Sequence, residues 1–62
     1  MFMIYGKQKD SGRFNPVNLE DGCFTRRKLY GSFFYTEQEA QKVVDSLNAD
    51  NKDLIFEYRK VG

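Results

Sequence analysis

Few side chains in this 62-residue chain are suited to catalysis. The chain contains a single cysteine, Cys23, and no histidine. A thiol nucleophile needs a neighbouring base, which is commonly histidine, and most zinc sites use histidine or several cysteines. We therefore expect a non-enzyme with no catalytic residue, no metal site and no bound cofactor. Cys23 is interpreted as a turn residue or a small buried side chain.

The paired carboxylates have simple structural explanations. Glu20 and Asp21 are adjacent in a predicted turn, where both are expected to be solvated. Glu37 and Glu39 fall in the first turn of a predicted helix, where the helix dipole favours anions. We therefore assign none of these four carboxylates a role in acid/base chemistry.

One short basic run has the residue types of a nucleic-acid contact. Lysine and arginine pair with phosphates, and aromatic rings stack on unpaired bases. The run Arg26-Arg27-Lys28 lies between Phe24 and Tyr30. The alternative is a solvated strand end whose cations deter pairing between sheet edges. The candidate nucleic-acid contacts are Arg13, Phe24, Arg26, Arg27 and Lys28.

The overall charge does not favour nucleic acid as the partner. Ten basic and nine acidic residues leave a net charge of +1. Residues 1–35 hold six basic and three acidic residues, or +3, whereas residues 36–62 hold four and six, or −2. This balance excludes a strongly cationic nucleic-acid arm and a strongly acidic mimic of DNA.

The elements that must position these side chains begin with a strand over residues 2–7, which are rich in β-formers. Residues 13–19 contain Pro16, which has no N–H for a ladder, so this arm is expected to be an edge strand or an extended loop. Asp21-Gly22 predicts a hairpin turn. A second strand is predicted over residues 28–34, with a bulge or close backbone approach at Gly31.

A helix is predicted to start after Thr36. The Thr36 hydroxyl is expected to accept the N–H of Glu39 in a capping box, and Tyr35 to pack on Ala40 as a hydrophobic staple. Ala40 begins an apolar stripe with helical spacing, which continues with Val43, Val44 and Leu47. The helix is expected to end near Asn48 or Ala49, with Asn48 or Asn51 in a left-handed conformation.

The pattern of elements predicts one α+β domain over residues 1–62. Residues 54–60 alternate in polarity and read as the last strand. The order β-(hairpin)-β-α-β favours a small three- to four-stranded, mainly antiparallel sheet with one helix packed on one face. The first strand is placed between the other two main strands and antiparallel to both.

A single helix cannot cover all the apolar side chains of such a sheet. The chain has ten aromatic residues, and neighbours on a strand point to opposite faces. Phe2, Ile4, Leu54, Phe56 and one of Phe33 or Phe34 are expected to meet the helix. The opposite face is a candidate interaction surface, formed by Met3, Tyr5, Tyr30, Ile55 and Arg59. Two alternatives stay open: the arm of residues 13–19 covers this face, or its apolar residues are simply exposed.

The compartment is predicted from two absences. No segment approaches the roughly 20 apolar residues of a membrane span, and the apolar amino-terminal run is too short for a signal peptide. A lone unpaired cysteine suits a reducing compartment. We expect a cytoplasmic protein that makes no membrane contact.

Parts of the chain resemble a known group of proteins. The opening Met1-Phe2-Met3-Ile4-Tyr5-Gly6, the helix end Leu47-Asn48 and the closing Phe56-Glu57-Tyr58-Arg59-Lys60 are similar to small uncharacterised proteins of phages and conjugative elements of Gram-positive bacteria. The resemblance implies a mobile-element setting and transfers no activity, cofactor or site residue.

Three hypotheses of function follow. The first is a protein-interaction module that uses an aromatic sheet face to form a homodimer or to dock on a protein partner. The second is a binder of single-stranded nucleic acid through Arg26, Arg27, Lys28 and neighbouring aromatic residues. The third, which follows from the resemblance alone, is an inhibitor of a host enzyme.

Overall fold

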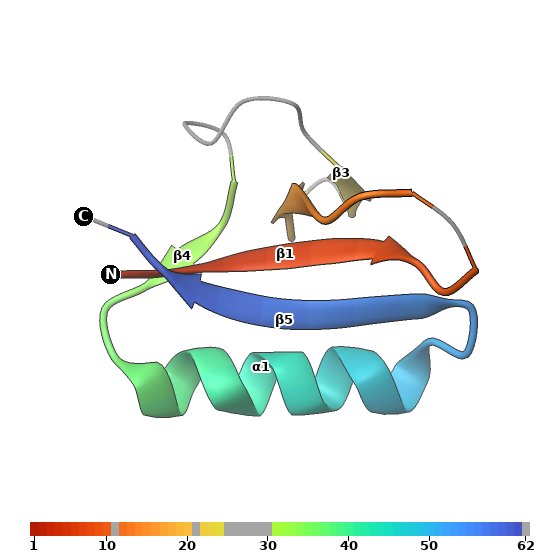
Figure 1. Ribbon diagram of the computed structural model, residues 1–62. Helices are drawn as coiled ribbons and strands as arrows, with labels where there is room; N and C mark the ends of the chain where they lie inside the picture. The colour runs from red at the N-terminus through yellow and green to blue at the C-terminus, as the bar shows by residue number, and fades with distance from the viewer. Residues whose placement is uncertain (11, 21, 25–30, 62) are drawn as a thin grey trace.

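The computed structural model describes residues 1–10, 12–20, 22–24 and 31–61. These residues form a sheet of short strands and one helix (Figure 1). In chain order the elements are β1 (Phe2–Gln8), β2 (Asn15–Asn18), β3 (Cys23–Phe24), β4 (Phe33–Phe34), α1 (Glu37–Asp50) and β5 (Leu54–Lys60). The predicted fold class, α+β with a mainly antiparallel sheet and one packed helix, is confirmed.

β1 is the central strand of the sheet. β5 runs antiparallel to it along its whole length. The opposite edge of β1 is shared, because β4 pairs with Phe2 and Met3 whereas β2 pairs with Tyr5 and Gly6. The strands before and after the helix are thus both antiparallel to β1, which lies between them as predicted.

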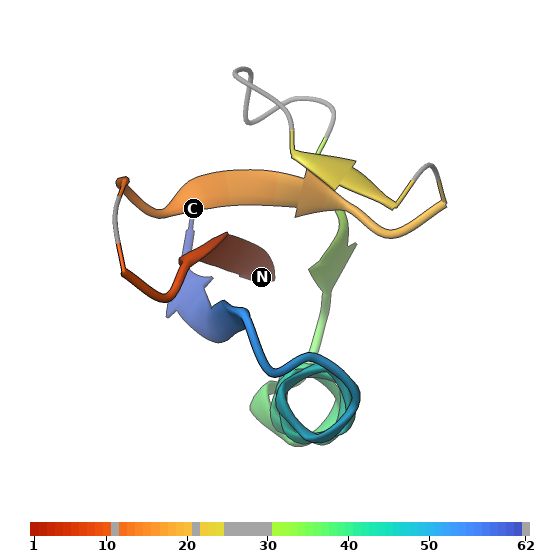
Figure 2. The same cartoon turned by 90° about the vertical axis from the view of Figure 1, so that its right-hand side faces the viewer.

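β2 and β3 form a hairpin that crosses β1 steeply (Figure 2). Gly22 in the turn has a φ of +67°, a left-handed value that a residue without Cβ adopts readily. Its N–H donates to the C=O of Asn18 at 2.9 Å. The predicted hairpin is therefore present, with Gly22 as its turn residue, and Asp21 lies outside the described residues.

The arm that contains Pro16 differs from the prediction. β2 has β1 on one edge and β3 on the other, so it is neither an edge strand nor a loop. The two described pairs with β3 are made by Val17 and Asn18, beyond the proline, so its missing N–H interrupts neither of them. A proline is compatible with an inner strand here because each of the two described ladders is two residue pairs long.

β4 is shorter than the strand predicted over residues 28–34. Gly31 is part of a bend, and Ser32 precedes the strand. Ser32 nevertheless joins two strands, because its N–H donates to Val17 at 2.8 Å and its C=O accepts from Ile4 at 3.1 Å. Residues 28–30 lie outside the described residues.

The helix begins as the capping pattern predicts. The Glu39 N–H donates to the Thr36 hydroxyl at 3.2 Å. The predicted staple is wrong, because the Tyr35 side chain is 77% exposed. The helix ends at Asp50, one residue beyond the predicted Ala49. Asn51 caps it in an extended rather than the predicted left-handed conformation, with backbone and side-chain N–H groups donating to Leu47.

The core lies between the helix and the concave side of the sheet. Its buried members are Ile4, Val17, Ala40, Val44 and Phe56. Phe34 packs against them, so it is the member of the Phe33-Phe34 pair that meets the helix. Phe2, Val43, Leu47 and Leu54 also pack there, as the alternation and the helical stripe predicted.

Candidate interaction surface

The sheet face turned away from α1, here called the outer face, carries the odd-numbered residues of β1. Ile4 is in the core, so Met3 and Tyr5 point the other way. Met3 pairs with Arg59 in β5 and with Phe33 in β4. Cross-strand partners share a face, so Arg59 and Phe33 belong to the outer face as well.

Around Tyr5 the outer face is covered rather than open. The Tyr5 side chain is 4% exposed and that of Met3 is 7% exposed. The Arg59 guanidinium lies over the Tyr5 ring, 4.6 Å from its centroid, and donates to Glu57 at 2.9 Å. The prediction that Met3 and Tyr5 form an exposed contact surface is therefore wrong.

The cover comes from the chain's own arm. Pro16 is buried and lies opposite Tyr5, and Phe14 is half-buried. The Phe14 ring contacts two cations, with the Arg59 guanidinium 5.3 Å and the Lys7 ammonium 5.5 Å from its centroid. Such contacts are favourable because the face of an aromatic ring is electron-rich. The alternative in which residues 13–19 fold over this face is the one observed at Tyr5.

The remaining residues of the predicted interaction face are divided. Ile55 is half-buried, and the Arg59 side chain is 49% exposed while it stacks on Tyr5. Tyr30 lies outside the described residues. Of the predicted set, Arg59 is the described member whose side chain is open to a partner.

The predicted nucleic-acid contacts are not brought together in the described part of the chain. Arg13 is exposed, and its C=O accepts a hydrogen bond from the Asn15 side chain at 2.9 Å. The backbone of Phe24 pairs with Val17 in the hairpin. Arg26, Arg27 and Lys28 lie outside the described residues.

At the other end of the outer face, large apolar side chains are bare. Met1 is 48%, Phe33 45% and Tyr35 77% exposed. The Phe33 and Tyr35 rings meet edge to face, with centroids 5.7 Å apart. Met1 lies two residues before Met3, the partner of Phe33, so all three side chains share one end of the sheet. We call Met1, Phe33 and Tyr35 the aromatic corner.

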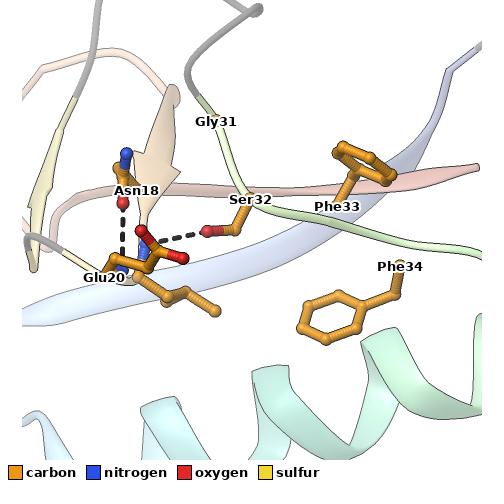
Figure 3. Close-up of a pocket in the computed structure, with 7 residues that line it drawn as sticks. Asn18, Glu20, Gly31, Ser32, Phe33 and Phe34 are labelled. Atoms are coloured by element: carbon orange, nitrogen blue, oxygen red, sulfur yellow. Dashed lines mark hydrogen bonds between the residues drawn. The ribbon is translucent and has the colours of Figure 1, made fainter.

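A hollow of about 500 Å³ adjoins this corner (Figure 3). Its lining includes Phe33 and Phe34 from β4, Ser32 before them, and Asn18 and Glu20 from the hairpin. Two of its polar groups are engaged: the Ser32 hydroxyl accepts from the N–H of Leu19 at 2.8 Å, and the Asn18 side chain accepts from the N–H of Glu20 at 2.9 Å. Figure 3 shows Phe34 directed toward the helix and Phe33 away from it. The hollow thus offers shape, an apolar wall and one carboxylate, that of Glu20.

The sequence analysis did not decide whether Phe33 or Phe34 meets the helix, and it placed Tyr35 against Ala40. A signal for the outward direction of Phe33 and Tyr35 was nevertheless present in the sequence. The run Phe33-Phe34-Tyr35 directly precedes the helix cap, and alternation along an extended chain puts its first and third residues on one face. Because Phe34 fills the core, Phe33 and Tyr35 must point outward.

Comparison with protein-family models, with curated proteins and with solved structures found no match. Among the described residues, no group of three or more His, Cys, Asp or Glu side chains could hold a metal ion. The same residues contain no helix that is long and apolar enough to span a membrane. The geometry of the outer face is therefore the basis for a functional assignment.

Proposed function

We propose that the protein is a small, non-enzymatic interaction module that binds a second copy of itself through the aromatic corner. The observation that carries this is the gathering of Met1, Phe33 and Tyr35 at one end of the outer face. Exposed aromatic side chains supply a large contact area at little cost in side-chain entropy, which is why they are enriched in interfaces.

A second copy is favoured over other partners for two reasons. A chain of this size buries little apolar surface on folding, so burial between two copies adds what the monomer lacks. The net charge of +1 also places little electrostatic repulsion between copies. A twofold axis near Phe33 would bring the same three side chains of both copies together.

The dimer is expected to be weak. A standard interface buries about 800 Å² of accessible surface on each partner. The total accessible surface of this chain is 4761 Å². The three side chains of the corner form a smaller contact than that standard. We therefore expect a dissociation constant between about 100 µM and 1 mM.

Sedimentation equilibrium from about 10 µM to 1 mM tests this model. Tyr35→Ser and Phe33→Ser are expected to weaken dimerisation about tenfold each, as for aromatic residues at the centre of an interface. Lys52→Ser, on the exposed turn after α1, is the matched control and should leave the dimer unchanged. A clean monomer across this range would rule out the homodimer.

The other hypotheses are less well supported by the described residues. For single-stranded nucleic acid, the outer-face cations Lys7 and Arg59 are already engaged, Lys7 with Phe14 and Arg59 with Tyr5, Phe14 and Glu57. Salt-dependent binding of a labelled oligonucleotide would favour this alternative, since nonspecific affinity is mostly electrostatic. A mobile-element origin, a host-enzyme target and a cytoplasmic location stay predictions from the sequence.

A further inference from the structure

On the edge of β5 that faces away from β1, the backbone groups of one residue, Phe56, form hydrogen bonds with a side chain of the helix. Asn48 accepts from the N–H of Phe56 at 2.9 Å and donates to the C=O of Phe56 at 3.1 Å. Both backbone groups of Phe56 therefore point away from β1. The Asn48 amide acts there as a one-residue substitute for a neighbouring strand.

Beyond Phe56 this edge continues without such a substitute. In an antiparallel pair the residues alternate between facing the partner strand and facing away. The N–H of Val61 donates to the C=O of Met1 at 2.9 Å, so the odd-numbered residues face β1. Tyr58 and Lys60 therefore direct their N–H and C=O groups outward, and in the described part of the chain no strand pairs with this edge.

A hollow of about 350 Å³ lies beside this free edge. It is lined by Tyr58 from β5 and by Glu37, Gln41, Lys42 and Asp45 from α1, which runs alongside β5 (Figure 1). The side chain of Tyr58 is on the helix side of the sheet, where its ring meets Phe2 edge to face. A residue paired opposite Tyr58 would point into the same hollow, because cross-strand partners share a face.

The hollow is negative where such a side chain would enter. The Tyr58 hydroxyl donates to Glu37 at 2.8 Å, and the Gln41 amide donates to Asp45 at 2.8 Å. The hydrogen bond to Glu37, then desolvation and the negative charges of Glu37 and Asp45, raise the pKa of Tyr58 above its ordinary value. The lining therefore carries two carboxylates, those of Glu37 and Asp45, and one ammonium, that of Lys42.

We propose that an extended segment of another protein adds to β5 at residues 58–60 as a further strand, with a lysine or arginine side chain directed between Glu37 and Asp45. Main-chain hydrogen bonds supply affinity in this mode, and the hollow supplies selectivity for a cation. The site is separate from the aromatic corner, so it stands or falls independently of the homodimer.

A second copy of the chain does not fit this edge. Antiparallel pairing of two β5 strands centred on Tyr58 would set Lys60 of one copy opposite Phe56 of the other. The Asn48 amide already occupies the outward N–H and C=O of Phe56. Moving the centre to Arg59 or to Lys60 would set two arginines or two lysines directly opposite each other, which is unfavourable.

The test uses the whole chain, labelled with ¹⁵N, and an acetylated and amidated pentapeptide, Val-Thr-Val-Lys-Val, which spans residues 57–61 in antiparallel pairing when its lysine lies opposite Tyr58. Titration to about 5 mM is expected to shift the backbone amide signals of Tyr58 and Lys60 first, because a ladder this short binds weakly. The same peptide with Glu in place of Lys should bind about tenfold less tightly, since it sets like charges together. N-methylation of the peptide backbone should abolish binding.

Two pairs of variants separate the ladder from the hollow. Lys60→Pro removes an outward N–H without touching the β1 ladder, so the fold should persist while peptide binding is lost; Lys60→Ala should bind normally. Glu37→Gln and Asp45→Asn should each weaken binding of the Lys peptide about threefold. Glu39→Gln, on the same helix but outside the hollow, is their control.

Three results would overturn this site. One is the absence of shifts at Tyr58 and Lys60 at 5 mM peptide, about the highest concentration at which such a titration is informative. The second is equal binding by Lys60→Pro and Lys60→Ala. The third is a shift of the same two amides with protein concentration alone, which would assign the edge to a second copy.

Discussion

The two ends of the outer face are built from the same kinds of residue but differ in exposure. At one end Tyr5 is buried under Arg59 and opposite Pro16, and the same guanidinium contacts Phe14. At the other end Phe33 and Tyr35 meet edge to face and remain open. The difference arises because the arm before β2 crosses only the first of these regions. Alternation along a strand thus decides which face a ring points to, whereas the route of a distant segment decides whether that ring is covered.

The largest expected contrast is between two tyrosines of this face. Tyr5→Ala should lower the free energy of unfolding by about 3 kcal/mol, because it leaves a cavity beneath Arg59 and Pro16. Tyr35→Ala should change it by no more than about 0.5 kcal/mol, as is usual at exposed positions. Urea unfolding followed by circular dichroism measures both. Similar losses for the two variants would contradict the assigned difference in burial.

The cover itself can be weakened without changing Tyr5. Phe14→Ala should lower the free energy of unfolding by about 1 kcal/mol, because Phe14 is half-buried and its ring contacts Lys7 and Arg59. Thr36 makes no contact with the covered face. Thr36→Ser keeps the hydroxyl that caps the helix, so this variant serves as the control. An unchanged urea midpoint in Phe14→Ala would show that the arm does not cover the face in solution.

A smaller effect is expected at the cation of the covered end. Arg59→Met keeps a long apolar stem over Tyr5 but removes the guanidinium and its contact with Glu57, at a cost of about 0.5 kcal/mol. The stability of the wild type should decrease slightly in 1 M NaCl, where the Debye length is about 3 Å, and that of Arg59→Met should not. Equal changes in stability with salt for the two proteins would indicate that the charge of Arg59 does not stabilise its contacts with Tyr5 and Glu57.

The helix side of the sheet offers a comparison that depends on pH. The pKa of Tyr58 is raised above its ordinary value of 10.0, first by the hydrogen bond that its hydroxyl donates to Glu37. A group whose pKa is raised on folding stabilises the fold below the unfolded value and loses that stabilisation as the pH rises through the folded value. The wild type should therefore lose more stability than Tyr58→Phe above about pH 10.

Spectrophotometric titration of the tyrosines checks the same assignment. The titration step that disappears in Tyr58→Phe should be one above pH 10. Glu37→Gln should move that step downward, because the neutral amide no longer resists the tyrosinate charge. A Tyr58 step below its ordinary value would contradict the hydrogen bond in solution.

Local chemistry made several features predictable from the sequence. The Thr36 cap, the apolar stripe from Ala40 to Leu47 and the Gly22 turn each depend on residues within a few positions of one another. The parallel direction of the strands before and after the helix followed from general rules of chain topology, and placing β1 between them, which left room for the crossover, is confirmed. The errors at Tyr35 and Asn51 concern element ends, where tertiary contacts compete with local preference.

The candidate surface was less predictable because exposure is a property of the whole chain. The surplus of aromatic side chains over what one helix can cover was readable from composition, and Phe33 and Tyr35 represent that surplus in the structure. Met3 and Tyr5 were assigned to the same surplus, but both are buried, and the arm lies beside Tyr5. That contact joins residues far apart in sequence, and no local pattern encodes it.

The amino-acid sequence alone determined the α+β class, the helix with its cap and stripe, and the alternation that sends Tyr5 and Phe33 to the outer face. Tertiary structure decided that Tyr5 is covered, that Phe33 and Tyr35 are bare, and that Asn48 holds one residue of the β5 edge while Tyr58 and Lys60 stay open. The physical reason is range: caps, turns and alternation arise from neighbours along the chain, whereas burial and edge pairing depend on which distant segments come to lie beside them.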